Sequence, residues 1–153
     1  MISSQELELL GCEELARIEG EGQDALKLIK RNEILSVKGM VLPPMFSFNV
    51  LKLALLLHDS ELEASGVTWQ KIKKDLLKRE DIFLRKCENI PIYQMSETRI
   101  EMLESIFQET YASFGDSIEK KAELYGNLVF RVCQWTLCMR CLMHASKYFK
   151  NED

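Results

Sequence analysis

The chain has 153 residues, of which 46% are hydrophobic and 29% are charged, with a formal net charge of −4 and a pI of about 5.4. This composition fits one folded domain with a core and excludes a disordered or fibrous chain. The acidic balance argues against nucleic-acid binding, which usually needs a basic surface. Glycine (7) and proline (3) are scarce, which favours an all-helical protein with few turns.

The first predicted helix covers residues 4–38. Small or apolar residues recur in it with the alternating four- and three-residue spacing of a coiled-coil seam. The seam consists of Leu15, Ile18, Gly22, Ala25 and Ile29. Gly20 and Gly22 weaken the helix, and we expect them to ease a change in its pairing register. Because one seam cannot stay buried alone, this helix needs a partner.

Two adjacent prolines, Pro43 and Pro44, end the first helix. Proline does not allow a helix to continue on its N-terminal side, but Pro44 can begin a new one. The following segment, 46–59, is apolar nearly all round, which is typical of a helix at the centre of a core. The prolines are therefore predicted to form a sharp corner between a charged helix and a buried one.

A basic amphipathic helix is predicted next, with Thr68 as its N-cap. Its apolar face includes Trp69 and Ile72, and its wet face carries several lysines. Residues 67–86 contain seven bases and only three acids, whereas acids predominate in the first helix and in residues 97–119. A solvated helix face is the favoured interpretation of Lys71–Lys78 taken alone.

The second half predicts a short helical piece ending near Pro91, a helix beginning at Ser96, a turn at residues 114–116, and a long last helix from about Ser117 to Phe149. The helix after Ser96 has an apolar stripe of Ile100, Leu103, Phe107 and Tyr111. Its carboxylates Glu101 and Glu104 are expected on a solvated face. The first and last helices are the natural partners, and Trp69 and Trp135 are expected in the core.

Residues 126–145 lack acids and are mostly apolar, so a membrane span has to be weighed. Arg131, Gln134 and Arg140 interrupt the run, and an arginine at mid-span is costly in lipid. A buried helix is therefore the favoured interpretation, and no membrane contact is expected. Residues 1–25 are acidic and carry no apolar signal-peptide core, so the five cysteines are expected to be reduced thiols.

A zinc site was considered for Cys133, Cys138, Cys141 and His144. Zinc-binding cysteine pairs usually lie on tight turns, whereas this segment is helical and contains neither glycine nor proline. Buried thiols are the favoured interpretation, so no metal site and no cofactor are expected. His58 and His144 are isolated, no cysteine or serine has an evident base partner, and no phosphate-binding glycine loop occurs. We therefore expect no enzymatic activity in this chain.

The predicted class is all-α: an antiparallel two-helix coiled-coil stalk base that carries a small bundle of about six helices. This outline resembles the stalk tip, or microtubule-binding domain, of dynein heavy chains. The resemblance spans residues 25–142. The matching segments, in order, are ALKLIKRNEILSVKGMVLPP, VLKLALLL, WQKIKKDL, REDIFLRKCENIP, FGDSIEKKA and VCQWTLCM.

The resemblance implies an outgoing stalk helix over 1–38, a globular head over 39–135, and the start of a returning stalk helix over 136–153, with the two stalk helices paired within the chain. It implies a tubulin partner, a cytoplasmic, cytoskeletal location that includes the cilium or flagellar axoneme, and a parent motor with an AAA+ ATPase ring outside these residues. The implied joint between stalk and head is Lys38, Pro43 and Pro44. The implied microtubule-binding residues are Lys52, Arg85, Lys86, Lys120, Lys121 and Arg131.

Some positions depart from the family pattern. Dynein heads usually carry a base four residues after the second proline, where this chain has Phe48, and its nearest base is Lys52. This departure favours a second interpretation: a non-motor helical interaction module that kept the fold but binds microtubules weakly or not at all. An unrelated helical-bundle scaffold is a third.

Overall fold

The computed structural model describes residues 12–59, 61–77, 83, 85, 87, 92, 95–112 and 117–150. All regular structure in this part of the chain is helical, which confirms the all-α class. The helices are α2 (Cys12–Lys27), α3 (Arg31–Lys38), α4 (Met45–His58), α5 (Trp69–Asp75), α7 (Glu97–Tyr111), α8 (Ile118–Glu123) and α9 (Asn127–Lys150), with a 3₁₀ turn at Ala64–Gly66.

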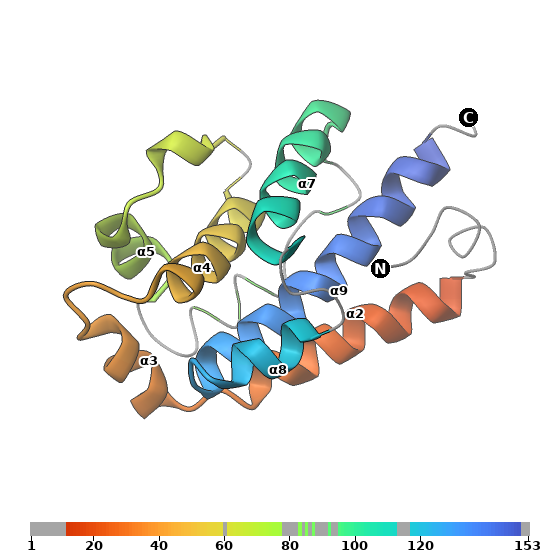
Figure 1. Ribbon diagram of the computed structural model, residues 1–153. Coiled ribbons are helices and arrows are strands. Elements are labelled where there is room, and N and C mark those ends of the chain that lie inside the picture. Colours follow the sequence, from red (N-terminus) through yellow and green to blue (C-terminus); the bar gives the residue numbers. More distant parts are fainter. Residues whose placement is uncertain are drawn as a thin grey trace.

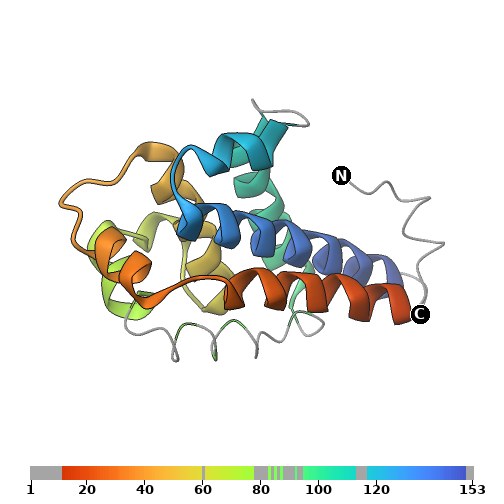
Figure 2. The same cartoon turned by 90° about the horizontal axis from the view of Figure 1, so that it is seen from below.

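Helix α9 is the central element of the fold. It packs against α2, α4, α7, α8 and α3, and it runs antiparallel to α2 (Figures 1 and 2). All five predicted seam positions of the first helix are buried, so the first and last helices are partners as expected. No helix in the described ranges is long and apolar enough to cross a membrane.

Helix α2 lies close against α9 at Gly22. A Cβ added at Gly22 would lie 3.1 Å from Cys138 Cβ and 3.3 Å from Trp135 Cδ1, whereas one added at Gly20 would meet nothing within 4 Å. The missing side chain at Gly22 therefore lets the two backbones approach. In this pairing Gly22 contributes to tight packing, and Gly20 is the glycine with room around it.

The predicted single helix over 4–38 is wrong, because the chain leaves the helix at Leu28 and starts α3 at Arg31. The first residue of α9 holds this break together. Asn127 Nδ2 donates to Leu28 O (3.1 Å) and to Glu33 Oε1 (3.0 Å), while Glu33 Oε1 also accepts from the Lys30 N–H (2.7 Å). A contact from far along the chain thus satisfies the backbone where α2 ends.

The predicted unbroken helix from Ser117 to Phe149 is also wrong. Gly126 separates α8 from α9 with φ +99°, the only left-handed residue in the described ranges. Side chains other than glycine are strained at such a φ. The local conformation at this single glycine therefore divides the segment into two helices.

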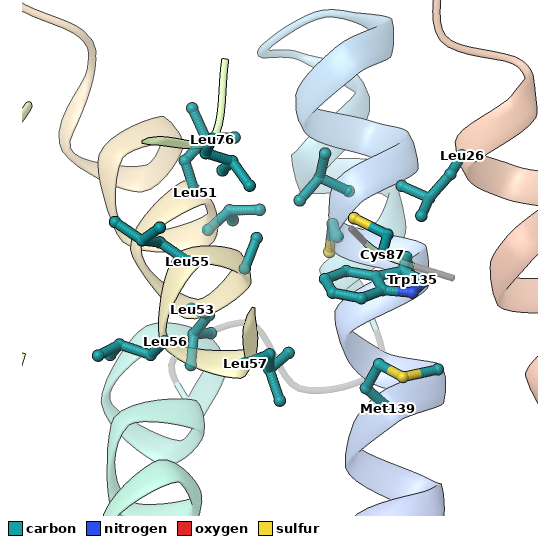
Figure 3. Packing of buried hydrophobic residues seen from close by; sticks show 14 of the residues in the cluster. Leu26, Leu51, Leu53, Leu55, Leu56, Leu57, Leu76, Cys87, Trp135 and Met139 are labelled. Carbon is teal, nitrogen blue, oxygen red and sulfur yellow. The ribbon is translucent and has the colours of Figure 1, made fainter. Parts of the chain in front are cut away.

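Helix α4 packs against three other helices, α9, α7 and α5. Figure 3 shows Leu57 on the side of α4 that faces Trp135 and Met139 of α9, whereas Leu55 and Leu56 point away from α9. Both tryptophans are buried, as predicted. The predicted N-cap is confirmed as well, since the Thr68 side chain accepts from the Lys71 N–H. The helix predicted to begin at Ser96 has this residue as its N-cap, because the Ser96 side chain accepts from the Arg99 N–H.

Arg99 fastens α7 to the end of α4. Its guanidinium donates to the carbonyls of Leu56 (2.7 Å), Asp59 (2.6 Å) and Leu62 (2.5 Å). Two of these acceptors belong to the last turn of α4 and its C-cap, where carbonyls lack helical partners. A cation at a helix C-terminus is also favoured by the helix dipole.

Candidate partner-binding surface

The proline corner lies at the end of the molecule away from the start of α2 and the end of α9 (Figures 1 and 2). We call residues 39–44 the tip loop. Pro43 is buried and Pro44 is the N-cap residue of α4, with its carbonyl accepting from the Phe48 N–H (3.0 Å). The prolines therefore form the corner that the sequence predicts.

The tip loop is held at both ends. Its first half is fixed by Trp69 Nε1, which donates to Met40 O (2.9 Å), and by the Met40 N–H, which donates to Val37 O (3.1 Å). Its second half is fixed by the buried ring of Pro43. Trp69 of α5 thus has two structural roles: its ring packs in the core, and its indole N–H holds the tip loop in place.

The exposed surface of the tip loop and of the adjoining Met45, which together we call the tip, is apolar. The exposed fractions are 91% at Val41, 86% at Leu42, 73% at Met45 and 38% at Met40. Sequence reasoning missed this feature. The run MVLPPM can pack into a core as easily as it can protrude, so its composition alone gives no sign of exposure.

Lysines flank the apolar tip. Lys38, at the end of α3, lines one shallow depression together with Gln70, Lys73 and Lys74 of α5. Lys73 Nζ also lies 5.9 Å from the Trp69 ring centroid, at cation–π distance. Lys71 instead pairs with Asp75 (2.6 Å). The structure thereby joins Lys38, predicted at the joint, to two lysines that the sequence assigned to a solvated face.

A second basic group lies on α8 and the start of α9. Lys120 is exposed and Lys121 is half-buried. Arg131 is half-buried and bonded internally: it donates to Asn127 Oδ1 (3.1 Å) and Gln134 Oε1 (3.0 Å), and its guanidinium lies 4.8 Å from the Phe130 ring centroid. These contacts fix the orientation of the Arg131 guanidinium group.

Arg131 also lines a groove of about 510 Å³ between α2 and α9. The charges along this groove are mixed. Its charged residues are Arg17, Glu21, Asp24, Glu119 and Arg131. An acidic partner would meet three carboxylates there, so the groove is less suited to it than the tip is.

The remaining predicted residues lie apart from these groups or outside the described ranges. Lys52 is half-buried on α4 and Arg85 is exposed. Lys86 lies outside the described residues. Of the predicted binding residues, only Lys120, Lys121 and Arg131 therefore lie on the adjoining helices α8 and α9, and none lies at the tip.

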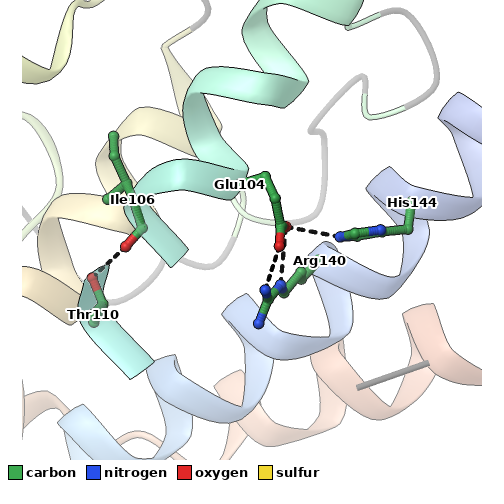
Figure 4. A network of polar contacts seen from close by, with 5 residues as sticks. All are labelled: Glu104, Ile106, Thr110, Arg140 and His144. Atoms are coloured by element: carbon green, nitrogen blue, oxygen red, sulfur yellow. Dashed lines mark hydrogen bonds and ion pairs between the residues drawn. The ribbon is translucent and has the colours of Figure 1, made fainter. Parts of the chain in front are cut away.

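A partly buried ionic cluster joins α7 to α9. Glu104 accepts hydrogen bonds from His144 Nε2 (2.8 Å) and from Arg140 Nε (3.0 Å), and it also pairs with a terminal nitrogen of Arg140 (Figure 4). Burial alone would raise the pKa of Glu104, but the hydrogen bonds and the Arg140 charge outweigh it and lower the pKa to about 2. The expectation of a solvated Glu104 is therefore wrong.

The cysteines of α9 are buried or half-buried. Burial raises the pKa of Cys133 to about 11 and that of Cys138 to about 12, so both thiols are protonated at neutral pH. In the described part of the chain, no group of three or more potential ligands could hold a metal ion.

One cysteine does have a base beside it, contrary to expectation. Cys87 Sγ lies 3.5 Å from His58 Nε2. The Cys87 side chain is only 1% exposed, however, so a substrate has no access to its sulfur. The pair is therefore a polar contact within the core.

Comparison of the chain with protein-family models and with curated proteins finds no match.

Proposed function

We propose that the chain is a dynein-type stalk tip that binds microtubules and couples the register of its stalk helices to its affinity for tubulin. The observation that carries this proposal is the rigid, lysine-flanked tip at the end of the molecule away from the start of α2 and the end of α9. The outer surface of a microtubule is strongly acidic, so clustered bases at the tip are attracted to it.

In this proposal residues 1–38, which contain α2 and α3, are the outgoing stalk segment, 39–135 the head and 136–153 the start of the returning helix, and the α2–α9 pair is the base of the stalk. The parent protein would be a cytoskeletal AAA+ motor of the cytoplasm or the axoneme. The filament contacts would be the predicted bases, above all Lys120 and Lys121 on α8, joined by the lysines of the tip. This chain would bind and hydrolyse no nucleotide.

The coupling would run through the α2–α9 pairing. Gly22 sits against Cys138 and Trp135, and Ala25 is the next small seam residue, three positions later. If α2 slid by three residues, Ala25 would replace Gly22 opposite Cys138, and α2 and α9 would have to separate by a few tenths of an ångström to accommodate its small side chain. Such a pair of alternative packings is a bistable element. Its motion would reach Lys38 through the α2–α3 joint at Leu28.

The second candidate is a non-motor helical interaction module. Phe48 is the observation that favours it, because the ring at this position packs against the hydrophobic core, where dynein heads usually carry a base. In such a module the tip would recognise a different acidic protein.

Charge reversal on α8 separates the two candidates. We expect the wild-type chain to co-sediment with microtubules in a salt-sensitive manner, and Lys120→Glu/Lys121→Glu to reduce binding at least tenfold at low salt while the far-UV circular dichroism is unchanged. The matched control is Lys27→Glu/Lys30→Glu, which makes the same charge change at two exposed lysines near the end of α2. No binding of the wild type at low salt, with the helices fixed in either register, would refute the microtubule proposal.

A further inference from the structure

Exposed apolar residues are concentrated at the tip. Seven large hydrophobic side chains are exposed in the described part of the chain, and four of them lie within residues 40–45. Apolar side chains scattered singly over a surface are ordinary, but a contiguous group is typical of an interaction site. Electrostatic attraction to an acidic partner does not require exposed apolar side chains, so their concentration at the tip needs a separate explanation.

The most exposed pair, Val41 and Leu42, is held in a fixed position. The carbonyl of Met40 just before the pair is bound by Trp69, and the ring of Pro43 just after it is buried. A group that is already ordered loses little conformational entropy when it binds. Pro43 and Pro44 have no backbone N–H, so docking would bury two fewer donors that need partners.

The surroundings of this pair indicate the sign of the partner's charge. Lys38, Lys73 and Lys74 share a depression beside Trp69, whose indole holds the loop. An apolar centre with a charged, hydrated rim is the usual arrangement of a protein–protein contact. The rim is positive here, so the complementary surface is acidic.

We infer that Val41 and Leu42 form an apolar anchor that enters a hydrophobic depression on an acidic protein surface. Part of the affinity for that surface therefore does not depend on salt. The inference rests on the proposed function, and the acidic surface is that of the filament. A lipid bilayer suits the anchor less well. The two side chains together contain fewer carbons than one myristoyl chain, which by itself gives only marginal membrane binding.

The test replaces apolar side chains by polar ones of similar shape. We expect Val41→Thr/Leu42→Asn to weaken microtubule co-sedimentation at least tenfold, about 1.4 kcal/mol, at every salt concentration and without changing the salt dependence. Lys120→Glu/Lys121→Glu should instead alter the salt dependence. The matched control, Val41→Ile/Leu42→Met, keeps the anchor apolar and should bind as the wild type does. Since both residues are exposed, thermal unfolding should be unaffected.

The outcomes separate the two proposals. If the wild type co-sediments with microtubules and Val41→Thr/Leu42→Asn binds them equally well, the anchor is overturned and the microtubule proposal stands. If the wild type does not bind filaments at all, both fail. Val41- and Leu42-dependent binding to phosphatidylserine vesicles, with filament binding unaffected, also overturns the inference and assigns the anchor to a membrane.

Discussion

Single residues set the closeness of the helix packing. At Gly22 the absence of one methyl group allows α2 to lie against Trp135 and Cys138 of α9, while the neighbouring Gly20 has open space. The two glycines are two positions apart in the same helix and carry the same intrinsic penalty for helix formation. They therefore form a natural pair for separating packing from helix propensity.

We expect Gly20→Ala to stabilise the protein by about 0.5–1 kcal/mol, because alanine lowers the cost of the helical backbone and its Cβ meets nothing. Gly22→Ala gains the same propensity term but overpacks the interface, which typically costs about 1–3 kcal/mol. Chemical denaturation should therefore rank the Gly20 variant above the Gly22 variant by about 1 kcal/mol or more. Equal effects of the two substitutions would show that α2 and α9 are not tightly packed at Gly22.

Pairs of helices are joined by a few polar clusters, and the cluster of Glu104, Arg140 and His144 joins α7 to α9 through ion pairs. Its carboxylate has a pKa of about 2 in the folded chain, below the ordinary value of 4.5. A lowered pKa means that the carboxylate form stabilises the folded state. That stabilisation is fully present above pH 4.5 and is lost as the pH falls toward 2.

The pKa difference corresponds to at most about 3 kcal/mol at neutral pH. We expect Glu104→Gln to destabilise the protein by roughly 2–3 kcal/mol at pH 7, because it leaves Arg140 buried without its carboxylate. The loss should shrink when unfolding is measured between pH 4.5 and 2. Glu109→Gln, at an exposed position of the same helix, is the control and should change stability by no more than about 0.5 kcal/mol. A Glu104→Gln effect that does not vary with pH would contradict the lowered pKa.

Sequence reasoning succeeds where the signal is local. The seam of the first helix, the cap at Thr68, the helix start at Ser96 and the stripe of α7 depend on residues close together in the sequence, and all are confirmed. It fails where distant residues decide. Nothing around Leu28 forbids a continuous helix, and the break becomes visible only when Asn127, about a hundred residues later, bonds to it. The exposure of Val41 and the pairing of Glu104 likewise depend on tertiary placement.

At the scale of the whole molecule, α9 connects the parts that the proposed function requires to communicate. Its first residue holds the α2–α3 joint, from which α3 leads to the tip loop. Its middle faces Gly22, and its later turns are joined to α7 through Arg140 and His144. A shift of α2 along α9 would therefore move the joint at Leu28 and leave the α7 attachment in place. The tip loop begins eleven residues after Leu28, so it is the part most exposed to such a shift.

Cysteine traps test this directly. In a Cys141→Ser background, Gly22→Cys faces the native Cys138 at nearly disulfide spacing, since a Cβ at position 22 lies 3.1 Å from Cys138 Cβ and a small shift reaches the usual range. Oxidation should trap the observed pairing. Ala25→Cys should cross-link to Cys138 only if α2 slides by three residues. We expect both cross-links to form and to be detected on non-reducing gels. The two trapped forms should differ at least tenfold in microtubule affinity, and reduction of the disulfides should abolish this difference. Cross-linking of Gly22→Cys alone would mean that α2 and α9 have one pairing, and the tip would then hold its partner without a register switch.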